Sequence, residues 1–146
     1  IELIVRGICC LKVGIPGISE NIHVRSIVGN FLEHSRIFFF LNDGEEELYM
    51  GSADWMPRNL DRRVEILFPV LDDTLKEKVK HILDVELADN TKAHVLKPDG
   101  EYEKIDRRGK VLVNSQKQFC EEAVAAVPKT DHVYRERVFV PAEPAE

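Results

Sequence analysis

Short, nearly continuous apolar runs recur along the chain and are typical of strands buried in a sheet. Such runs cover residues 2–8, 35–41 and 64–70. Between the last two, Asn42-Asp43-Gly44 is a strong hairpin signal, which predicts that residues 47–52 return as the partner of 35–41. The pattern therefore predicts several strands, two of them joined by a tight turn.

Helical periodicity separates these strands. Apolar positions recur at intervals of three and four residues within 20–32, 74–88 and 115–124, which predicts three helices. Residues 91–96 and 101–106 read as two further short strands joined by a Lys-Pro-Asp-Gly turn. The expected fold is α/β: a single domain with a mixed, mainly buried sheet flanked by helices.

Length and composition agree with one globular domain. The chain has 146 residues, of which 44% are hydrophobic and 32% charged. The longest uncharged apolar stretch, residues 37–41, is far too short for a transmembrane helix. A net charge of −6 argues against a general nucleic-acid-binding surface, but it leaves local anion sites open. Because residues 1–10 already read as a core strand, we expect the chain to be part of something longer.

The cysteine count is odd, with thiols at Cys9, Cys10 and Cys120. Adjacent cysteines on a strand point to opposite faces and cannot easily share a metal ion. We interpret all three as reduced and structural, as is usual in the cytosol.

Arg6 interrupts an otherwise apolar strand. A guanidinium cannot stay buried without an anionic partner. One interpretation is a structural ion pair with Asp54 or Asp61. The other is a phosphate clamp, since the planar fork of arginine matches phosphate oxygens. The sequence favours neither.

Two other segments carry candidate chemistry. His34 and Arg36 fall at a predicted helix–strand junction, and a period of two would place both on one face of the strand. Residues 51–63 follow a predicted strand. They begin with small residues and then contain two acidic residues, an asparagine and three arginines. That density favours phosphate binding over a salt-bridged loop anchored by Trp55.

Residues 91–117 are locally basic, which indicates a solvated face or, less simply, an auxiliary patch for a polyanion.

These segments together resemble the polyphosphate kinase family. The similarity rests on the runs LIVRGICCL, GIPGISENI, EHSRI and SADWMPRNLDRR, and it extends from about residue 1 to 124. The resemblance implies the last C-terminal domain of that family, with a phospholipase-D-like α/β fold over 1–127 and a C-terminal tail at 128–146. It also implies an enzyme that transfers the terminal phosphate of ATP reversibly onto inorganic polyphosphate.

The same resemblance implies the site residues. Arg6 falls on the arginine of the VRG motif and His34 on the histidine of the EH-x-R motif, both of them ATP-phosphate ligands in the family. Arg63 matches a further arginine near the phosphates. His34 would have a supporting role, because the phosphorylated histidine and the magnesium-associated arginines lie in an upstream domain of the family. We therefore expect this chain alone to be inactive.

Comparison with the phospholipase-D pattern leaves two alternatives. That pattern requires a lysine where Arg36 stands and an aspartate where Leu41 stands, whereas Gly51-Ser52-Ala53-Asp54 echoes its last part. A phosphodiesterase half-site that dimerises is one alternative, and a non-catalytic phosphate-binding module is the other.

The resemblance also implies partners and cofactors. ATP, ADP and polyphosphate would be the ligands, and Mg²⁺ would act in the intact enzyme without being held tightly by this chain. The upstream domains would be its covalent partners in a homo-oligomer, in a cytoplasmic location that allows peripheral membrane association. We predict that Arg6, His34 and Arg63 converge on one pocket that solvent can reach, near the ends of neighbouring strands.

Overall fold

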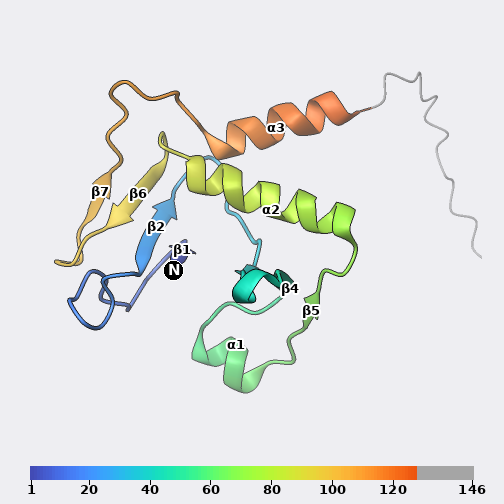
Figure 1. The fold of residues 1–146 in the computed structure, drawn as a ribbon, viewed down its shortest axis with the longest axis horizontal. Helices are drawn as coiled ribbons and strands as arrows, with labels where there is room; N and C mark the ends of the chain where they lie inside the picture. Colours follow the sequence, from blue (N-terminus) through green and yellow to red (C-terminus); the bar gives the residue numbers. More distant parts are fainter. Residues whose placement is uncertain (128–146) are drawn as a thin grey trace, which may run out of the picture.

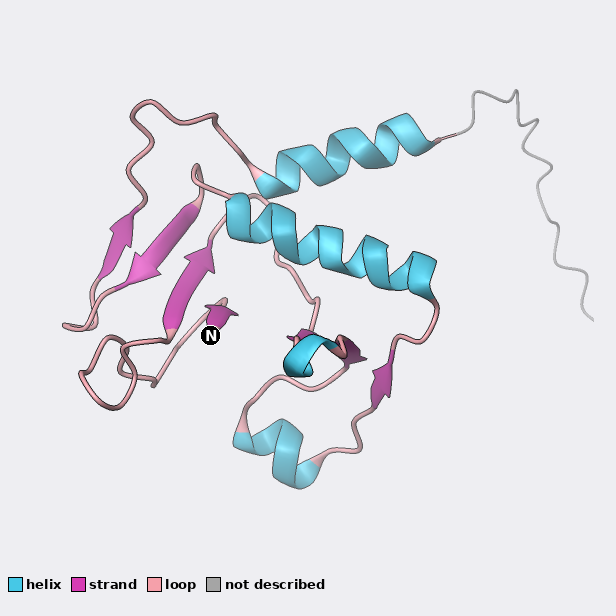
Figure 2. Cartoon of the chain, in the orientation of Figure 1, coloured by secondary structure: helices cyan, strands magenta, loops and turns pink. Residues whose placement is uncertain are grey.

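The computed structural model describes residues 1–127, and their strands form two separate sheets with helices beside them (Figures 1 and 2). This confirms the α/β class, but it replaces the one expected sheet with two. The tail expected over 128–146 lies outside the described residues. In chain order the elements are β1 (Glu2–Ile4), β2 (His23–Ile27), β3 (Ile37–Phe40), the 3-10 turn η1 (Asn42–Gly44), β4 (Glu47–Gly51), α1 (Pro57–Arg62), β5 (Leu67–Pro69), α2 (Asp73–Ala88), β6 (Ala93–Leu96), β7 (Tyr102–Lys104) and α3 (Ser115–Ala126).

The larger sheet is mixed and has the strand order β1-β2-β6-β7. β1 runs parallel to β2, whereas β2 with β6 and β6 with β7 are antiparallel. Val13, Val24 and Leu96 form its buried core, and Leu3 and Val5 pack against them. The predicted pair of strands joined by the Lys-Pro-Asp-Gly turn is confirmed as β6 and β7.

The helix predicted over 20–32 is wrong, because residues 23–27 form the strand β2 at the centre of this sheet. The apolar spacing does fit a helix. However, Val24 and Ile27 are β-branched and suit a pleated surface better than a helix. β2 also gains hydrogen bonds from a strand on each side, β1 and β6, a long-range effect that local periodicity does not report.

The smaller sheet is antiparallel, with the order β3-β4-β5. The predicted hairpin is confirmed at η1, where Asn42 and Asp43 have positive φ angles of 44° and 55°. Leu48 and Val70 form the core of this sheet with Val79 of α2. β3 is only half-buried, contrary to expectation, because its outer end extends beyond this small core.

The helices expected near residues 74–88 and 115–124 are confirmed as α2 and α3, which lie beside each other (Figure 1). α2 begins one residue earlier than expected, with Asp72 as its N-cap: the Asp72 carboxylate accepts a hydrogen bond from Leu75 N at 2.9 Å. The short helix α1 begins at Pro57, whose fixed φ suits the first position of a helix. No helix within residues 1–127 is long and apolar enough to cross a bilayer.

Asp89 joins α2, β6 and α3 at one buried point. Its Oδ1 accepts hydrogen bonds from the backbone N–H groups of Thr91, Lys92 and Ala93. Its Oδ2 accepts from both the backbone N–H and the hydroxyl of Ser115. Burial by itself raises the pKa of Asp89, but these hydrogen bonds outweigh it and lower that pKa overall. The carboxylate therefore stays ionised and fixes the start of α3 against the larger sheet.

Candidate functional site

Arg6 follows β1 and lies exposed at the edge of the larger sheet. Within residues 1–127 no ion pair joins it to Asp54 or Asp61, so the structural-pair interpretation is not supported. Asp54 instead pairs with Arg36. The guanidinium of Arg6 is thus open to solvent, as a phosphate ligand must be.

Arg36 is committed to a structural role. Its Nε and Nη2 donate to Oδ1 of Asp54 at 3.0 and 2.8 Å, and its Nη1 donates to the backbone oxygen of His34 at 2.8 Å. Arg36, which the sequence places next to His34 as candidate chemistry, is therefore engaged by protein groups in this structure. Its guanidinium ties the His34 backbone to the loop before α1.

His34 lies in the irregular segment between β2 and β3, not at the start of a strand as expected. Its side chain is exposed. On its other flank, Gln116 of α3 accepts a hydrogen bond from Phe31 N and donates to the Phe31 oxygen and to the carboxylate of Glu33. The segment carrying His34 is thus pinned on both sides, which holds the imidazole outward.

Arg63 caps the C-terminal end of α1 and is not part of the strand expected at 64–70, because β5 begins only at Leu67. Its side chain is 55% exposed, and its Nε lies 3.8 Å from Oε1 of Glu65. Glu65 also accepts hydrogen bonds from the Ser52 hydroxyl and, at 2.8 Å, from Asn59 Nδ2. The Ser52 and Asn59 hydrogen bonds, with the nearby charges of Arg63 and Arg36, lower the pKa of Glu65.

Sequence reasoning missed Glu65. It is the single charge in the run VEILFPV, directly after the arginine-rich segment, and that break in an apolar run is the signal that could have drawn attention to it. As a fixed anion it orients Arg63 and leaves part of the guanidinium facing solvent. The 51–63 segment therefore combines the two interpretations: it is an internally bonded loop, and it still presents arginines at the surface.

The three predicted ligands are only partly connected. The backbone oxygen of His34 accepts a hydrogen bond from Arg36. The charges of Arg36 and Arg63 both lower the pKa of Glu65, so His34 and Arg63 belong to one neighbourhood. No hydrogen bond or ion pair within residues 1–127 links Arg6 to that neighbourhood. The convergence of all three stays a prediction.

The comparisons with known proteins agree among themselves. Residues 1–116 match the family described as polyphosphate kinase C-terminal domain 2. The chain is 52% identical over 132 residues to a polyphosphate kinase of Lactiplantibacillus plantarum, covering 90% of this chain and 18% of that protein. It is 58% identical over 119 residues to polyphosphate kinase 1 of Chlorobaculum tepidum, covering 82% of this chain and 17% of that protein. The chain therefore spans less than a fifth of the length of these relatives.

A solved structure is also similar. The crystal structure of a polyphosphate kinase from Porphyromonas gingivalis superposes with a TM-score of 0.79 at 41% sequence identity, covering 85% of this chain and 19% of that chain. These values show a shared fold over most of this chain.

Proposed function

Because this chain belongs to the polyphosphate kinase family, as its C-terminal domain 2, we propose that it supplies phosphate-binding residues for transfer of the terminal phosphate of ATP onto inorganic polyphosphate. The exposed guanidinium of Arg6 is the observation that carries the proposal. We place the domain over residues 1–127.

Arg6 differs from Arg36 and Arg63, the arginines of the His34 neighbourhood, in its charge partners. Arg36 is held by Asp54, and Arg63 lies beside Glu65, whereas Arg6 has no acidic partner within residues 1–127. Phosphoryl transfer depends mostly on positioning and on neutralising charge on the phosphoryl oxygens. An unpaired arginine at a strand end supplies a fixed positive charge for this purpose.

We propose supporting roles for the other two residues. Arg63 would contact phosphate oxygens with the part of its guanidinium that Glu65 leaves free. His34 would donate a hydrogen bond to a phosphate oxygen or protonate a leaving oxygen. The nucleophilic histidine would lie in an upstream domain, so this chain completes a site that it does not contain in full.

Mg²⁺ enters the proposal as a cofactor of the intact enzyme. Within residues 1–127, no three His, Cys, Asp or Glu side chains gather in a way that could hold a metal ion. Asp54 and Glu65 are already engaged by arginine, serine and asparagine side chains. The described residues therefore do not fit a magnesium site of their own.

Exposed apolar side chains around α1 support the upstream domains as partners. Trp55 is 78% exposed, Leu60 60% and Val64 99%. A domain that stayed alone would rarely present so many large apolar side chains in one region. We propose that they dock onto the rest of a cytoplasmic, homo-oligomeric enzyme.

The test is Arg6→Ala in the full-length gene product, with Lys78→Ala, at an exposed position of α2, as the matched loss of one positive charge. We expect Arg6→Ala to lower polyphosphate synthesis from ATP about 10- to 100-fold, because one charge-assisted phosphate contact contributes roughly 1.5–3 kcal/mol. The melting temperature should stay unchanged. Equal activity of the two variants would contradict the proposal, and a diesterase assay on the same samples tests the phosphodiesterase alternative.

A further inference from the structure

We propose that the segment after β7 is an anchoring point for the polyphosphate chain; this rests on the function proposed above. We call the cluster of Lys104, Arg107 and Lys110 the basic turn. It lies within the region that the sequence marks as locally basic. The structure gives that region a shape and a charge distribution that the sequence does not.

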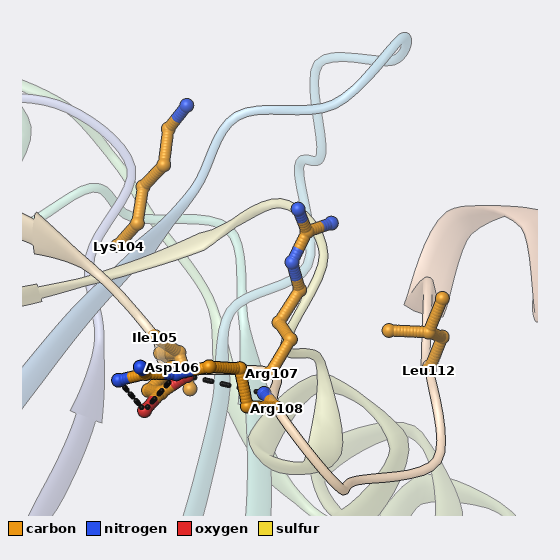
Figure 3. Close-up of a pocket in the computed structure, with 6 residues that line it drawn as sticks. All are labelled: Lys104, Ile105, Asp106, Arg107, Arg108 and Leu112. Carbon is orange, nitrogen blue, oxygen red and sulfur yellow. Dashed lines mark hydrogen bonds and ion pairs between the residues drawn. The ribbon is translucent and has the colours of Figure 1, made fainter.

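A shallow hollow of about 520 Å³ marks this segment (Figure 3). In that view the side chains of Lys104 and Arg107 extend in the same general direction, whereas Arg108 is folded back onto Asp106. Ile105 and Leu112 supply apolar walls. The hollow is lined by Lys104, Ile105, Asp106, Arg107, Arg108 and Leu112.

The charges of the segment do not cancel. Asp106 is its one acid, and Arg108 neutralises it through Nε and through Nη2 at 2.8 Å from Oδ2. The next acid upstream, Glu103, is paired with Lys97 at 2.8 Å. Within residues 1–127, no ion pair engages any cation of the basic turn. An unneutralised cationic cluster on a chain of net charge −6 is a local feature that points to an anionic ligand.

Backbone geometry holds two of the cations together. Lys110 N donates to the oxygen of Arg107 at 3.1 Å, which closes a tight turn, and Gly109 adopts the positive φ of 70° that this turn requires. The N–H of Arg108 donates to Oδ1 of Asp106 at 3.1 Å. Arg107 and Lys110 are therefore fixed at the two ends of one turn.

Sheet topology relates the basic turn to Arg6. β1 and β7 are the two edges of the larger sheet, and the pairing directions make them run the same way. Arg6 after β1 and Lys104 at the end of β7 therefore lie at the same end of the sheet. The order β1-β2-β6-β7 puts three strand intervals of about 4.8 Å between the edges, a backbone separation of about 14 Å.

This arrangement suits a long polyanion better than a single phosphate group. Every internal phosphate of polyphosphate carries negative charge, so one chain can meet cations at two places and gain affinity at each. Three exposed cations add charge attraction, while the apolar walls offer no hydrogen-bonding pattern that would select a base or sugar. We infer that long chains engage both places and that the shortest chains do not span them.

The test uses the full-length gene product and follows ATP formation from ADP with polyphosphate as phosphate donor. In the triple variant Lys104→Gln/Arg107→Gln/Lys110→Gln, we expect the KM for long-chain polyphosphate to rise about tenfold, since exposed ion pairs contribute roughly two- to threefold each. The KM for tripolyphosphate, the KM for ADP and kcat should change less than about twofold. A plot of the logarithm of long-chain affinity against the logarithm of salt concentration should become less steep. Its slope should change by about two, because each lost charge contact accounts for about 0.7.

Two controls isolate the effect of charge at this place. Lys76→Gln/Lys78→Gln/Lys117→Gln removes three positive charges from α2 and α3 and should leave the long-chain KM unchanged. Lys104→Arg/Arg107→Lys/Lys110→Arg keeps the charges and should behave as wild type, whereas the unchanged kcat of the glutamine variant shows that it is folded.

Three results would overturn the inference. One is an unchanged long-chain KM in the triple glutamine variant of an active enzyme, which leaves the proposed function intact. Another is an equal rise for tripolyphosphate and long chains. The third is loss of RNA binding without loss of polyphosphate binding, which would assign the basic turn to nucleic acid. A wild-type protein that forms no ATP from polyphosphate would instead refute the proposed function.

Discussion

Arg36 and Asp54 are joined by two hydrogen bonds to a single carboxylate oxygen, from Nε at 3.0 Å and from Nη2 at 2.8 Å. They lie 18 residues apart, on the segment before β3 and on the loop before α1. Because Nη1 also donates to the backbone oxygen of His34, this one guanidinium fixes a candidate phosphate ligand relative to the arginine-rich loop. The pair is a positioning device, not a ligand.

Arg36→Ala and Asp54→Ala should therefore be coupled in stability. We expect a double-mutant cycle, measured by urea unfolding, to give a coupling energy of about 0.5–1.5 kcal/mol for this partly exposed pair. In the full-length enzyme, Arg36→Lys should lower kcat more than it raises the KM for ATP, because a lysine cannot bridge both partners. A coupling energy near zero would show that the pair does not hold the segment.

A second prediction concerns pH. Burial, followed by the hydrogen bond and charge of Glu33, raises the pKa of Glu86 to about 8. The folded state therefore binds this proton more tightly than the unfolded state, whose carboxyl has a pKa near 4.5. The stabilisation is complete below about pH 4.5 and is lost as the pH rises toward 8. Between these values the free energy of unfolding should fall with a slope approaching about 1.4 kcal/mol per pH unit.

Glu86→Gln replaces this titratable carboxyl group with a neutral amide and should therefore flatten the dependence of the free energy of unfolding on pH. The variant should be more stable than wild type at pH 8 and similar to it at pH 5. Asp89 and Glu65 do not obscure the comparison, because their pKa values are lowered from 3.8 and 4.5, so the stability that they contribute is lost only at pH values below the range compared. Thermal unfolding at several pH values measures the difference, and parallel curves for the two proteins would contradict the assignment.

Local signals in the sequence predicted much of the fold. The Asn42-Asp43-Gly44 turn and the long periodic stretch of α2 depend on neighbours within a few residues, and both are confirmed. β2 was missed because its strand conformation comes from pairing with β1 and β6 on either side. The division into two sheets is likewise a long-range outcome that short apolar runs do not encode.

The candidate site shows the same limit. In the sequence, Arg36 next to His34 resembles a phosphate ligand. In the structure its guanidinium is hydrogen-bonded to Asp54, a pairing that the spacing of 18 residues does not indicate. Glu65, which orients Arg63, is separated from Ser52 by 13 residues and comes close only through the pairing of β4 with β5. Residue types identified the candidate ligands, but the three-dimensional contacts decided which of them are free.

A third prediction concerns the thiols. Cys9 is half-buried, Cys10 and Cys120 are exposed, and all three are free. Reductant should therefore leave the melting temperature unchanged, because there is no disulfide among them to constrain the unfolded chain. Thiol titration of the native protein should modify Cys10 and Cys120 faster than Cys9, which packs against the core of the larger sheet. A drop of several degrees on reduction would contradict this prediction.

The last prediction concerns phosphorylation of the isolated chain. A histidine that accepts the phosphoryl group of ATP needs cations around it to neutralise the transferred charge. His34 does not meet that requirement by itself: it is exposed, and the adjacent Arg36 is bound to Asp54. His23 lies 2.8 Å from Glu2, and His81 lies 3.0 Å from Glu122, so both have acidic neighbours that would repel ATP.

We therefore expect that residues 1–146, incubated with ATP labelled at the terminal phosphate, acquire no acid-labile phosphohistidine, whereas the full-length gene product does. Adding the upstream portion as a separate polypeptide should restore labelling of that portion and not of this chain. The Arg6→Ala variant should weaken the restoration, because its guanidinium would contact the same ATP phosphates from this side of the interface. Label on His34 in the isolated chain would reverse the assignment and make His34 a nucleophile instead of a supporting ligand.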